Sequence, residues 1–239
     1  MIQTVKAKHL LTAQLDELRQ LSTCVVASAI EGFGVRMYNT GFADSSIRCQ
    51  FRDLPPVIGY AATARIHSEE PPMEGGGYFY YDRSDLWKHI LSIPPPRIVV
   101  IQDLDDHPGL GAFVGSVHAH IFRALGCVAF VTNGTVRDIT DILPLGLQLF
   151  ASNVAVSHAY AHIFDYGCPV RIGGLDVAPG DLVHGDLHGV QTIPLEIADK
   201  VPAAAREIID RRKQIIDLCQ CSNFSLERLQ RLIREEEES

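Results

Sequence analysis

The stretch Val117-His-Ala-His-Ile-Phe-Arg-Ala-Leu-Gly-Cys-Val-Ala-Phe-Val131 decides the fold class of this chain. Val117, Ile121 and Leu125 recur every four residues, as on one face of a helix, and Gly126 stands where helices prefer to end. The apolar run that follows, from Cys127 to Val131, predicts a buried strand. A helix that leads directly into a buried strand is typical of an α/β layer.

The residues on both sides extend this unit. Arg97 to Gln102 is an apolar run that predicts a second buried strand, ending at Asp103. On the other side, Asn133-Gly134 predicts a tight turn and Val136 to Ile142 a short helix. The order strand, helix, strand, helix favours an α/β fold.

The rest of the chain adds helices at both ends and short strands between them. An early helix is expected over Ser22 to Ile30 and a strand over Val57 to Ala64. Glycine-rich turns separate four short strands in the second half, at Pro169 to Ile172, Leu175 to Val177, Asp181 to His184 and Val190 to Ile193. A long helix is predicted from Leu195 to Leu218, and a second helical stretch is capped by Ser225. We therefore expect one α/β domain over residues 1–218 and a helical C-terminal extension over residues 219–239.

Composition limits the classes of function. The 239 residues carry a formal charge of −8, which argues against nucleic acid as the main partner because phosphate binding needs a basic face. No apolar stretch approaches the roughly 20 residues that span a bilayer, and the N-terminus lacks the features of a secretory signal. The six cysteines form no disulfide or metal pattern. We expect free thiols in a cytoplasmic protein that binds no membrane.

The chemistry starts at Arg137 and Asp138, with Asp141 three residues on. A guanidinium recognises a carboxylate through a planar fork, and an aspartate offers oxygen to magnesium or manganese. The pair could also be a surface ion pair of little energetic value. Its place after a buried strand and a sharp turn favours the functional interpretation, because α/β proteins put functional groups there. Together, these residues suit a site in which a small keto acid lies between the Arg137 guanidinium and a metal ion on Asp138.

A helix start near Gly115 supplies a second element. The backbone N–H groups of Ser116, Val117 and His118 are predicted to be free, and the helix dipole favours an anion beside them. The stretch Gly109-Leu-Gly-Ala-Phe-Val-Gly115 resembles a dinucleotide fingerprint, but its third glycine comes one residue late and the ribose-binding acid is missing. We interpret it as a place where backbone approaches a ligand closely.

Two further histidine patterns could indicate metal sites, but each also has an ordinary structural explanation. His184, Asp186 and His188 alternate, so in a strand they would share one face. They are either zinc ligands or polar residues on an exposed strand or turn. His158 and His162 are four apart, as in metalloprotease helices, but the glutamate base is missing between them. A structural role is favoured for that second pair.

At these residues the chain resembles the regulator of ribonuclease activity A (RraA)-like family, which includes 4-hydroxy-4-methyl-2-oxoglutarate aldolases that also decarboxylate oxaloacetate. The likeness covers roughly residues 21–207. It is sharpest over Gly115-Ser-Val-His-Ala-His, over residues 126–138 and over Pro179-Gly-Asp-Leu-Val-His-Gly-Asp-Leu-His-Gly-Val190. The family signature is a glycine, a gap of about twenty residues, Arg-Asp, two residues and an acid. Gly115, Arg137, Asp138 and Asp141 match it.

The resemblance implies an α-β-β sandwich of the swivelling-domain type, assembled as trimers or hexamers with active sites between subunits. It implies Mg²⁺ or Mn²⁺ held by Asp138 and several waters. The carboxylate of a pyruvate unit would be held by Arg137 and the N–H groups at Val117 and His118, with Asn133 also in the substrate site. Asp186 and His188 would face the metal waters of a neighbouring subunit.

Two positions depart from the family pattern. Ser116 stands where the characterised aldolases carry an acid, and Asn133 where many members have aspartate. The resemblance still implies a carbon–carbon lyase acting through a pyruvate enolate, with 4-hydroxy-4-methyl-2-oxoglutarate or oxaloacetate as substrate. The proton carrier would be either a metal-bound water or a histidine such as His118 or His188. The alternative is a non-catalytic trimer that binds a ribonuclease or an RNA helicase. Methyl transfer is disfavoured because no glycine-rich cofactor loop with an acidic partner is present.

Overall fold

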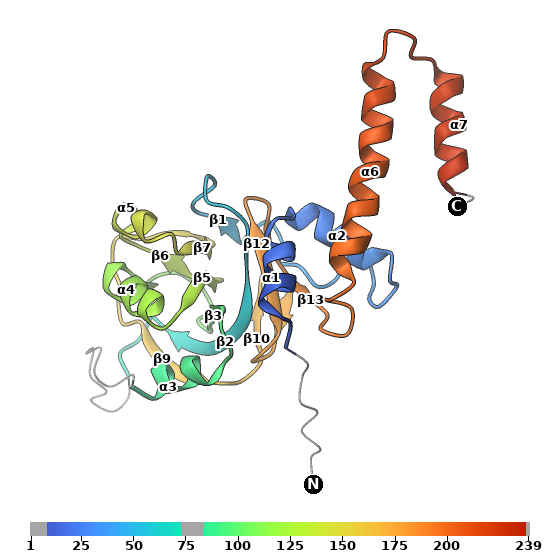
Figure 1. The fold of residues 1–239 in the computed structure, drawn as a ribbon. Coiled ribbons are helices and arrows are strands. Elements are labelled where there is room, and N and C mark those ends of the chain that lie inside the picture. The colour runs from blue at the N-terminus through green and yellow to red at the C-terminus, as the bar shows by residue number, and fades with distance from the viewer. Residues whose placement is uncertain (1–8, 73–83, 238–239) are drawn as a thin grey trace.

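One mixed sheet of eight strands organises the protein in the computed structural model, which describes residues 9–72 and 84–237 (Figure 1). Its order is β1 (Arg48–Cys49), β7 (Gln148–Ala151), β5 (Cys127–Thr132), β3 (Arg97–Asp103), β2 (Val57–His67), β12 (Leu182–Asp186) and β13 (Gly189–Ile193), with β9 (His162–Tyr166) also on β2. The four central strands are parallel and the outer ones antiparallel. The predicted α/β class is therefore confirmed.

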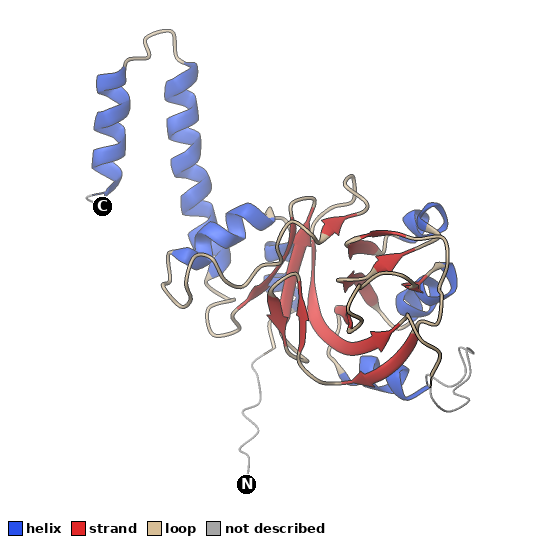
Figure 2. Cartoon of the chain, turned by 180° about the vertical axis from the view of Figure 1, so that it is seen from behind, coloured by secondary structure: helices blue, strands red, loops and turns tan. Residues whose placement is uncertain are grey.

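The long strand β2 curves the sheet. On one edge it runs parallel to β3, whereas its other edge pairs first with β12 and then with β9, both antiparallel. A register irregularity between Arg65 and Ile66 accompanies the second pairing, and bulges of this kind bend a strand. Figure 2 shows β2 as the long curved strand that joins the two halves of the sheet. The two ends of β2 consequently belong to different regions of the molecule.

The sheet is buried on both faces, which explains the uninterrupted apolar runs of its parallel strands. In β3, Val99 and Ile101 pack in the core beneath the helices, and Ile98 and Val100 pack in a second core on the opposite face. The first core is covered by α1 (Thr12–Arg19), α2 (Thr23–Glu31), α3 (Ser84–Ser92), α4 (Ser116–Ala124) and the start of α6 (Val201–Gln220). The second is covered by the hairpin of β10 (Val170–Ile172) and β11 (Leu175–Val177). These layers form the expected α-β-β sandwich.

The C-terminal helices leave this body. In α6 only Val201, Pro202 and Ala205 are buried. The helix then projects outward and α7 (Leu226–Glu237) folds back beside it (Figure 1). The expected boundary at 218/219 falls near the end of α6, and the division into two parts stays a prediction. Among residues 9–72 and 84–237, no helix is both long and apolar enough to cross a membrane.

Several elements differ from their predicted bounds. The helix expected over residues 136–142 is only α5 (Ile139–Ile142), because Thr135–Val136 forms the short strand β6 and Asp138 has a left-handed backbone. A 3₁₀ turn, Leu143–Leu145, follows α5. The long helix starts at Val201 rather than Leu195, and the proline in its first turn fits that start. Strand β7 was not predicted; its Gln148 is fully buried and donates through Nε2 to the Phe51 carbonyl at 2.9 Å.

Candidate active site

A small parallel sheet positions the Gly115 and Arg137 segments. It consists of β4 (Ala112–Val114), β6 (Thr135–Val136) and β8 (Asn153–Val154). Val114 lies opposite Val136, and the Arg137 N–H donates to the Val114 carbonyl at 3.0 Å. Gly115 and Arg137 are the residues that follow these two strands, so they meet at the carboxyl edge of the small sheet. Ligand sites of α/β proteins commonly form at such an edge.

Gly115 is a glycine for reasons of space. Its backbone is extended, with φ −129° and ψ −166°, which any residue can adopt. A Cβ atom at this position would lie 2.5 Å from Asp138 Oδ2 and 2.9 Å from Arg137 Nε. The absence of a side chain therefore lets the Arg137-Asp138 pair lie directly against the start of α4. We refer to Gly115, Ser116, Arg137 and Asp138 as the glycine–arginine–aspartate site.

Asp138 has an unusual backbone. Its φ of 56° and ψ of 34° are left-handed, a conformation that costs non-glycine residues energy and that clusters at functional sites. Asp138 Oδ2 accepts the Ser116 N–H at 3.0 Å, which links the two loops. Its carbonyl accepts from Asp141 and Ile142 at the start of α5. Within the described residues, Asp138 Oδ1 receives no hydrogen bond, so one carboxylate oxygen is available to a ligand.

The Arg137 guanidinium is also available. Its Nε lies 3.6 Å from Asp138 Oδ2, and the two side chains are 31% and 35% exposed. Within the described part of the chain, the guanidinium donates no hydrogen bond, so its N–H groups can take a carboxylate. A cation and an open carboxylate oxygen thus lie side by side on the surface, as the sequence led us to expect.

The first turn of α4 contributes less than predicted. Ser116 was expected to offer its N–H to an anion, but that N–H already donates to Asp138. Val117 is exposed, whereas the His118 side chain is only 6% exposed. The His118 ring stacks on Phe113 at 4.8 Å and lies 6.1 Å from Trp87. A proton carrier must reach its substrate, and this ring instead packs among aromatic side chains.

Asn133 has a structural partner in place of the expected substrate. Its Oδ1 accepts the Asp103 N–H at 2.7 Å and its Nδ2 donates to the Asp103 carbonyl at 2.8 Å. Both functions of the amide therefore join the ends of β3 and β5. The partner is thirty residues away, so the sequence held no sign of it.

Asp186 and His188 are not gathered at the glycine–arginine–aspartate site within one chain, whereas Asp141 lies beside it. Asp141 is exposed on α5, and its backbone N–H donates to the Asp138 carbonyl at 3.0 Å. Asp186 ends β12 and is 4% exposed, with Oδ2 accepting the Thr23 N–H at 2.9 Å and Oδ1 accepting the His188 N–H at 2.8 Å. The His188 ring also lies 3.1 Å from Oδ1. Their contribution to a neighbouring subunit stays a prediction.

His184 is a buried structural residue, which contradicts both interpretations for this histidine, whereas His188 lies in an exposed turn, as the second interpretation allowed. It is fully buried, with Nε2 3.1 Å from the Leu18 carbonyl and Nδ1 3.3 Å from Thr23 Oγ1. Burial lowers the pKa of His184 to about 4, so the ring is neutral at pH 7. Both ring nitrogens are used, and neither is open to zinc. No group of three or more His, Cys, Asp or Glu side chains that could hold a metal occurs in the described ranges.

Sequence reasoning missed a carboxylate network after β3. Asp105 Oδ2 accepts the N–H groups of Ser68 and Glu69 at 2.7 and 3.0 Å, and Oδ1 lies 2.7 Å from His67 Nδ1. Burial alone would raise the pKa of Asp105, but the hydrogen bonds from His67, Ser68 and Glu69 lower it to about 2. The acid-rich Asp103-Leu-Asp-Asp106 at a predicted strand end was the available signal.

The fold and site define an α/β sandwich whose glycine and Arg-Asp pair meet between parallel strands. The sequence profile of the RraA-like family (Aldolase/RraA) matches residues 15–191. The chain belongs to this family.

Individual similar proteins are consistent with this family assignment. The chain is 28% identical over 181 residues to a protein of Halalkalibacterium halodurans named "Putative 4-hydroxy-4-methyl-2-oxoglutarate aldolase", covering 75% of this chain and 76% of that protein. Two solved structures share the fold. A protein of Pseudomonas syringae pv. tomato has a TM-score of 0.73 at 21% identity, covering 96% and 98% of the two chains. Streptomyces coelicolor RraAS2, described as an unusual member of the RNase ES inhibitor RraA family, has a TM-score of 0.67 at 19% identity, covering 86% and 96%.

Proposed function

We propose that the protein is a divalent-metal-dependent carbon–carbon lyase that acts on a small 2-oxo acid, such as 4-hydroxy-4-methyl-2-oxoglutarate or oxaloacetate, through a pyruvate enolate. One observation carries the proposal: Gly115 leaves no room for a Cβ, because Arg137 and Asp138 occupy that space, with one Asp138 carboxylate oxygen that accepts no hydrogen bond from residues 9–72 and 84–237. A surface ion pair of no function would not need a glycine across the loop or a left-handed aspartate. The named aldolase relative supports the same class of reaction.

The residues present fit Mg²⁺ or Mn²⁺. Asp138 Oδ1 is a hard oxygen ligand, and within the described residues it belongs to no group of three or more His, Cys, Asp or Glu side chains that could hold a metal. Such sparse protein ligation suits Mg²⁺, which keeps several waters. When bound, the cation supplies Lewis-acid stabilisation of negative charge that develops on the keto oxygen.

The side chains have separate tasks in this proposal. Arg137 binds the substrate carboxylate through charge-assisted hydrogen bonds and fixes its orientation. Asp138 is held by the Ser116 N–H and by its left-handed backbone, so its free oxygen keeps one direction. Cleavage of the C3–C4 bond leaves the electron pair on C3, which takes up a proton to give pyruvate. The other fragment leaves as CO₂ from oxaloacetate, or as a second pyruvate from the aldol substrate, whose 4-hydroxyl gives up its proton as the new carbonyl forms. The burial of the His118 ring favours a water over this ring as the source of that proton.

The test is pyruvate release from both substrates, measured with Mg²⁺, with Mn²⁺ and with EDTA. Asp138→Asn keeps the shape of the side chain and removes its charge, so turnover should fall to background. Asp176→Asn is the matched control, because Asp176 forms an exposed ion pair with Arg171 on the β10–β11 hairpin. Turnover that survives both EDTA and Asp138→Asn would refute the proposal.

Gly115→Ala tests the observation that carries the proposal. The added methyl must displace Asp138 or Arg137, and a misplacement of about 1 Å can cost about a hundredfold in kcat/KM. The control is Gly32→Ala, whose new Cβ would meet only the Ala29 carbonyl at an ordinary 3.5 Å. Equal activity of the two variants would show that the close approach at Gly115 has no functional meaning.

A regulatory role is the second candidate, and the shared fold with RraAS2 favours it. Ser116 adds weight, because the acid that the resemblance places there in aldolases is missing. In this case no 2-oxo acid would be turned over, and the purified protein would bind a ribonuclease or RNA helicase. If the lyase proposal holds with Ser116 in place, decarboxylation of oxaloacetate should be faster than aldol cleavage, since it needs only the enolate half of the chemistry.

A further inference from the structure

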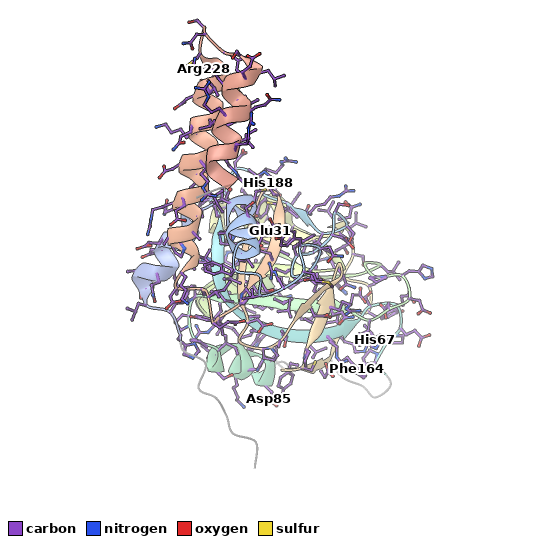
Figure 3. The ribbon with its side chains drawn as sticks, turned by 90° about the vertical axis from the view of Figure 1, so that its right-hand side faces the viewer. Glu31, His67, Asp85, Phe164, His188 and Arg228 are labelled. Atoms are coloured by element: carbon purple, nitrogen blue, oxygen red, sulfur yellow. The ribbon has the colours of Figure 1, made fainter. Side chains whose placement is uncertain are left out.

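Two histidines lie directly opposite each other on neighbouring strands, at the end of β2 far from β12. His67 of β2 pairs in register with His162 of β9, and their ring centres are 6.1 Å apart. The pair lines a groove of about 580 Å³ together with Pro71, Pro72 and Phe164. Figure 3 shows His67 and Phe164 close together at one edge of the body, and the two rings meet edge to face at 5.3 Å. We call this the His67–His162 pair.

Hydrogen bonds fix the tautomer of both rings. His67 Nδ1 lies 2.7 Å from Asp105 Oδ1, while Asp105 Oδ2 accepts the Ser68 N–H. His162 Nδ1 lies 2.8 Å from the Tyr160 carbonyl oxygen, which can only accept. Each Nδ1 must therefore carry the proton and donate it. In the neutral rings, the lone pair is consequently on Nε2 in both cases.

We propose that the His67–His162 pair binds a borderline transition metal ion, Zn²⁺ in the first instance, through the two Nε2 atoms. Neutral imidazole is a preferred ligand of Zn²⁺, Ni²⁺ and Cu²⁺. Histidines that bind these metals almost always donate the other ring N–H to a carboxylate or a carbonyl, which is the arrangement of His67 on Asp105 and of His162 on Tyr160.

The spacing of the rings and the charge of the groove bear on this assignment. With Zn–N bonds of about 2.0–2.1 Å and a tetrahedral angle at the ion, two imidazole ring centres lie roughly 5.2 Å apart, so the observed 6.1 Å requires the rings to approach by about 1 Å when the ion binds. Glu69, Glu70 and Asp106 also line the groove, and their negative charge favours a cation. Two imidazoles leave the other coordination positions to water, so we expect a Kd in the micromolar range, weaker than for a closed structural zinc site.

This site is independent of the proposed lyase. It uses imidazole nitrogen ligands on β2 and β9, whereas the proposed lyase uses a hard oxygen of Asp138. Calorimetric titration with ZnCl₂ of the untagged full chain, in excess Mg²⁺ to occupy oxygen sites, keeps the two apart. Failure of the Zn²⁺ titration would leave the lyase proposal unaffected, and loss of pyruvate release would leave this one unaffected.

We expect one Zn²⁺ per chain, with affinity falling at least about tenfold in His67→Gln and in His162→Gln. His120→Gln is the matched control, since His120 is an exposed histidine whose Nδ1 is likewise within 2.8 Å of a carbonyl, that of Ser116. Cu²⁺ electron paramagnetic resonance provides a second measurement, with hyperfine coupling to two imidazole nitrogens in the wild type and to one in each variant. Zn²⁺ affinity that is the same in all four proteins, or a Cu²⁺ spectrum without two-nitrogen coupling in the wild type, overturns the proposal.

Discussion

Asp138 and Asp186 were both expected to serve a metal site, yet the fold treats them in opposite ways. Asp138 is about one-third exposed, has a left-handed backbone and keeps one oxygen that accepts no hydrogen bond from the part of the chain that the structure describes. Asp186 is 4% exposed, and both of its oxygens accept hydrogen bonds, from Thr23 and His188. An acid whose bonds are all satisfied stabilises the fold, whereas an acid held in a strained, open position is available for chemistry. The difference separates two carboxylates that look alike in the sequence.

The largest expected effect is on stability at Asp186. Asp186→Ala leaves the buried Thr23 N–H and the His188 N–H without their acceptor, and should lower the free energy of unfolding by about 3–5 kcal/mol. Asp138→Ala removes one hydrogen bond at the surface and changes no contact in the core. It should therefore lower the free energy of unfolding by about 1 kcal/mol or less. Urea unfolding of both variants measures the contrast. Similar losses of unfolding free energy in the two variants would contradict the proposed difference between Asp186 and Asp138.

The second effect is the pH dependence set by His184, which lies on the same strand as Asp186. Burial lowers the pKa of His184 to about 4 in the folded state, against about 6.5 when unfolded. Between these values the unfolded chain binds the additional proton, so stability is fully present above pH 6.5 and is lost as the pH falls toward 4. The loss should be on the order of 3 kcal/mol.

Urea unfolding at pH 7.5, 6 and 5 tests this expectation. The decrease in the free energy of unfolding with falling pH should become smaller in His184→Gln. It should stay unchanged in His120→Gln, because His120 is exposed. Stability that stays constant over this range would show that the buried ring does not control acid sensitivity.

The smallest effect concerns Arg137. Charge-assisted hydrogen bonds to an anion are worth about 1.5–3 kcal/mol, so Arg137→Ala should reduce kcat/KM by roughly 10- to 150-fold. Arg137→Lys keeps the charge without the planar fork and should recover only part of the loss. The exposed Arg171→Ala provides the comparison variant. Kinetics of Arg137→Ala that match those of Arg171→Ala would remove Arg137 from the substrate site.

Local patterns in the sequence predicted the centre of the fold well. The apolar runs of β3 and β5 and the helix α4 depend on neighbours in the chain, and they appear where they were expected. The apolar face predicted for α4 is different, because Val117 is 49% exposed and the buried residues of the helix are His118, Ala119 and Phe122. Strand β7 was not predicted because it begins with a polar residue, Gln148. The hydrogen-bond partner of the Gln148 side chain, the Phe51 carbonyl, lies 97 residues away in the sequence. The start of α6 was placed too early because the apolar spacing continues back through the turn at Leu195.

In the candidate site, too, local patterns identified some residues, whereas the roles of others depend on tertiary contacts. Arg137, Asp138 and Gly115 were found because they lie next to predicted strand ends. The role of Asn133 on Asp103 and the packing of His118 on Phe113 depend on the tertiary fold, and no local signal indicated them. Nor could spacing show that His67 and His162 face each other, since 95 residues separate them and only the pairing of β2 with β9 brings them together.

The projecting hairpin of α6 and α7 has a practical consequence. Cys219 and Cys221 lie exposed near its outer end, whereas Cys127 is buried, and burial raises the pKa of its thiol to about 12. Maleimide dyes react with thiolates, so they should label the hairpin and the exposed Cys24 and leave Cys127 untouched. Cys49 and Cys168 are half-buried, and burial raises the pKa of both thiols. A chain in which Cys24, Cys49 and Cys168 are replaced by Ser would then carry fluorophores on the hairpin, where energy transfer between copies could report on assembly.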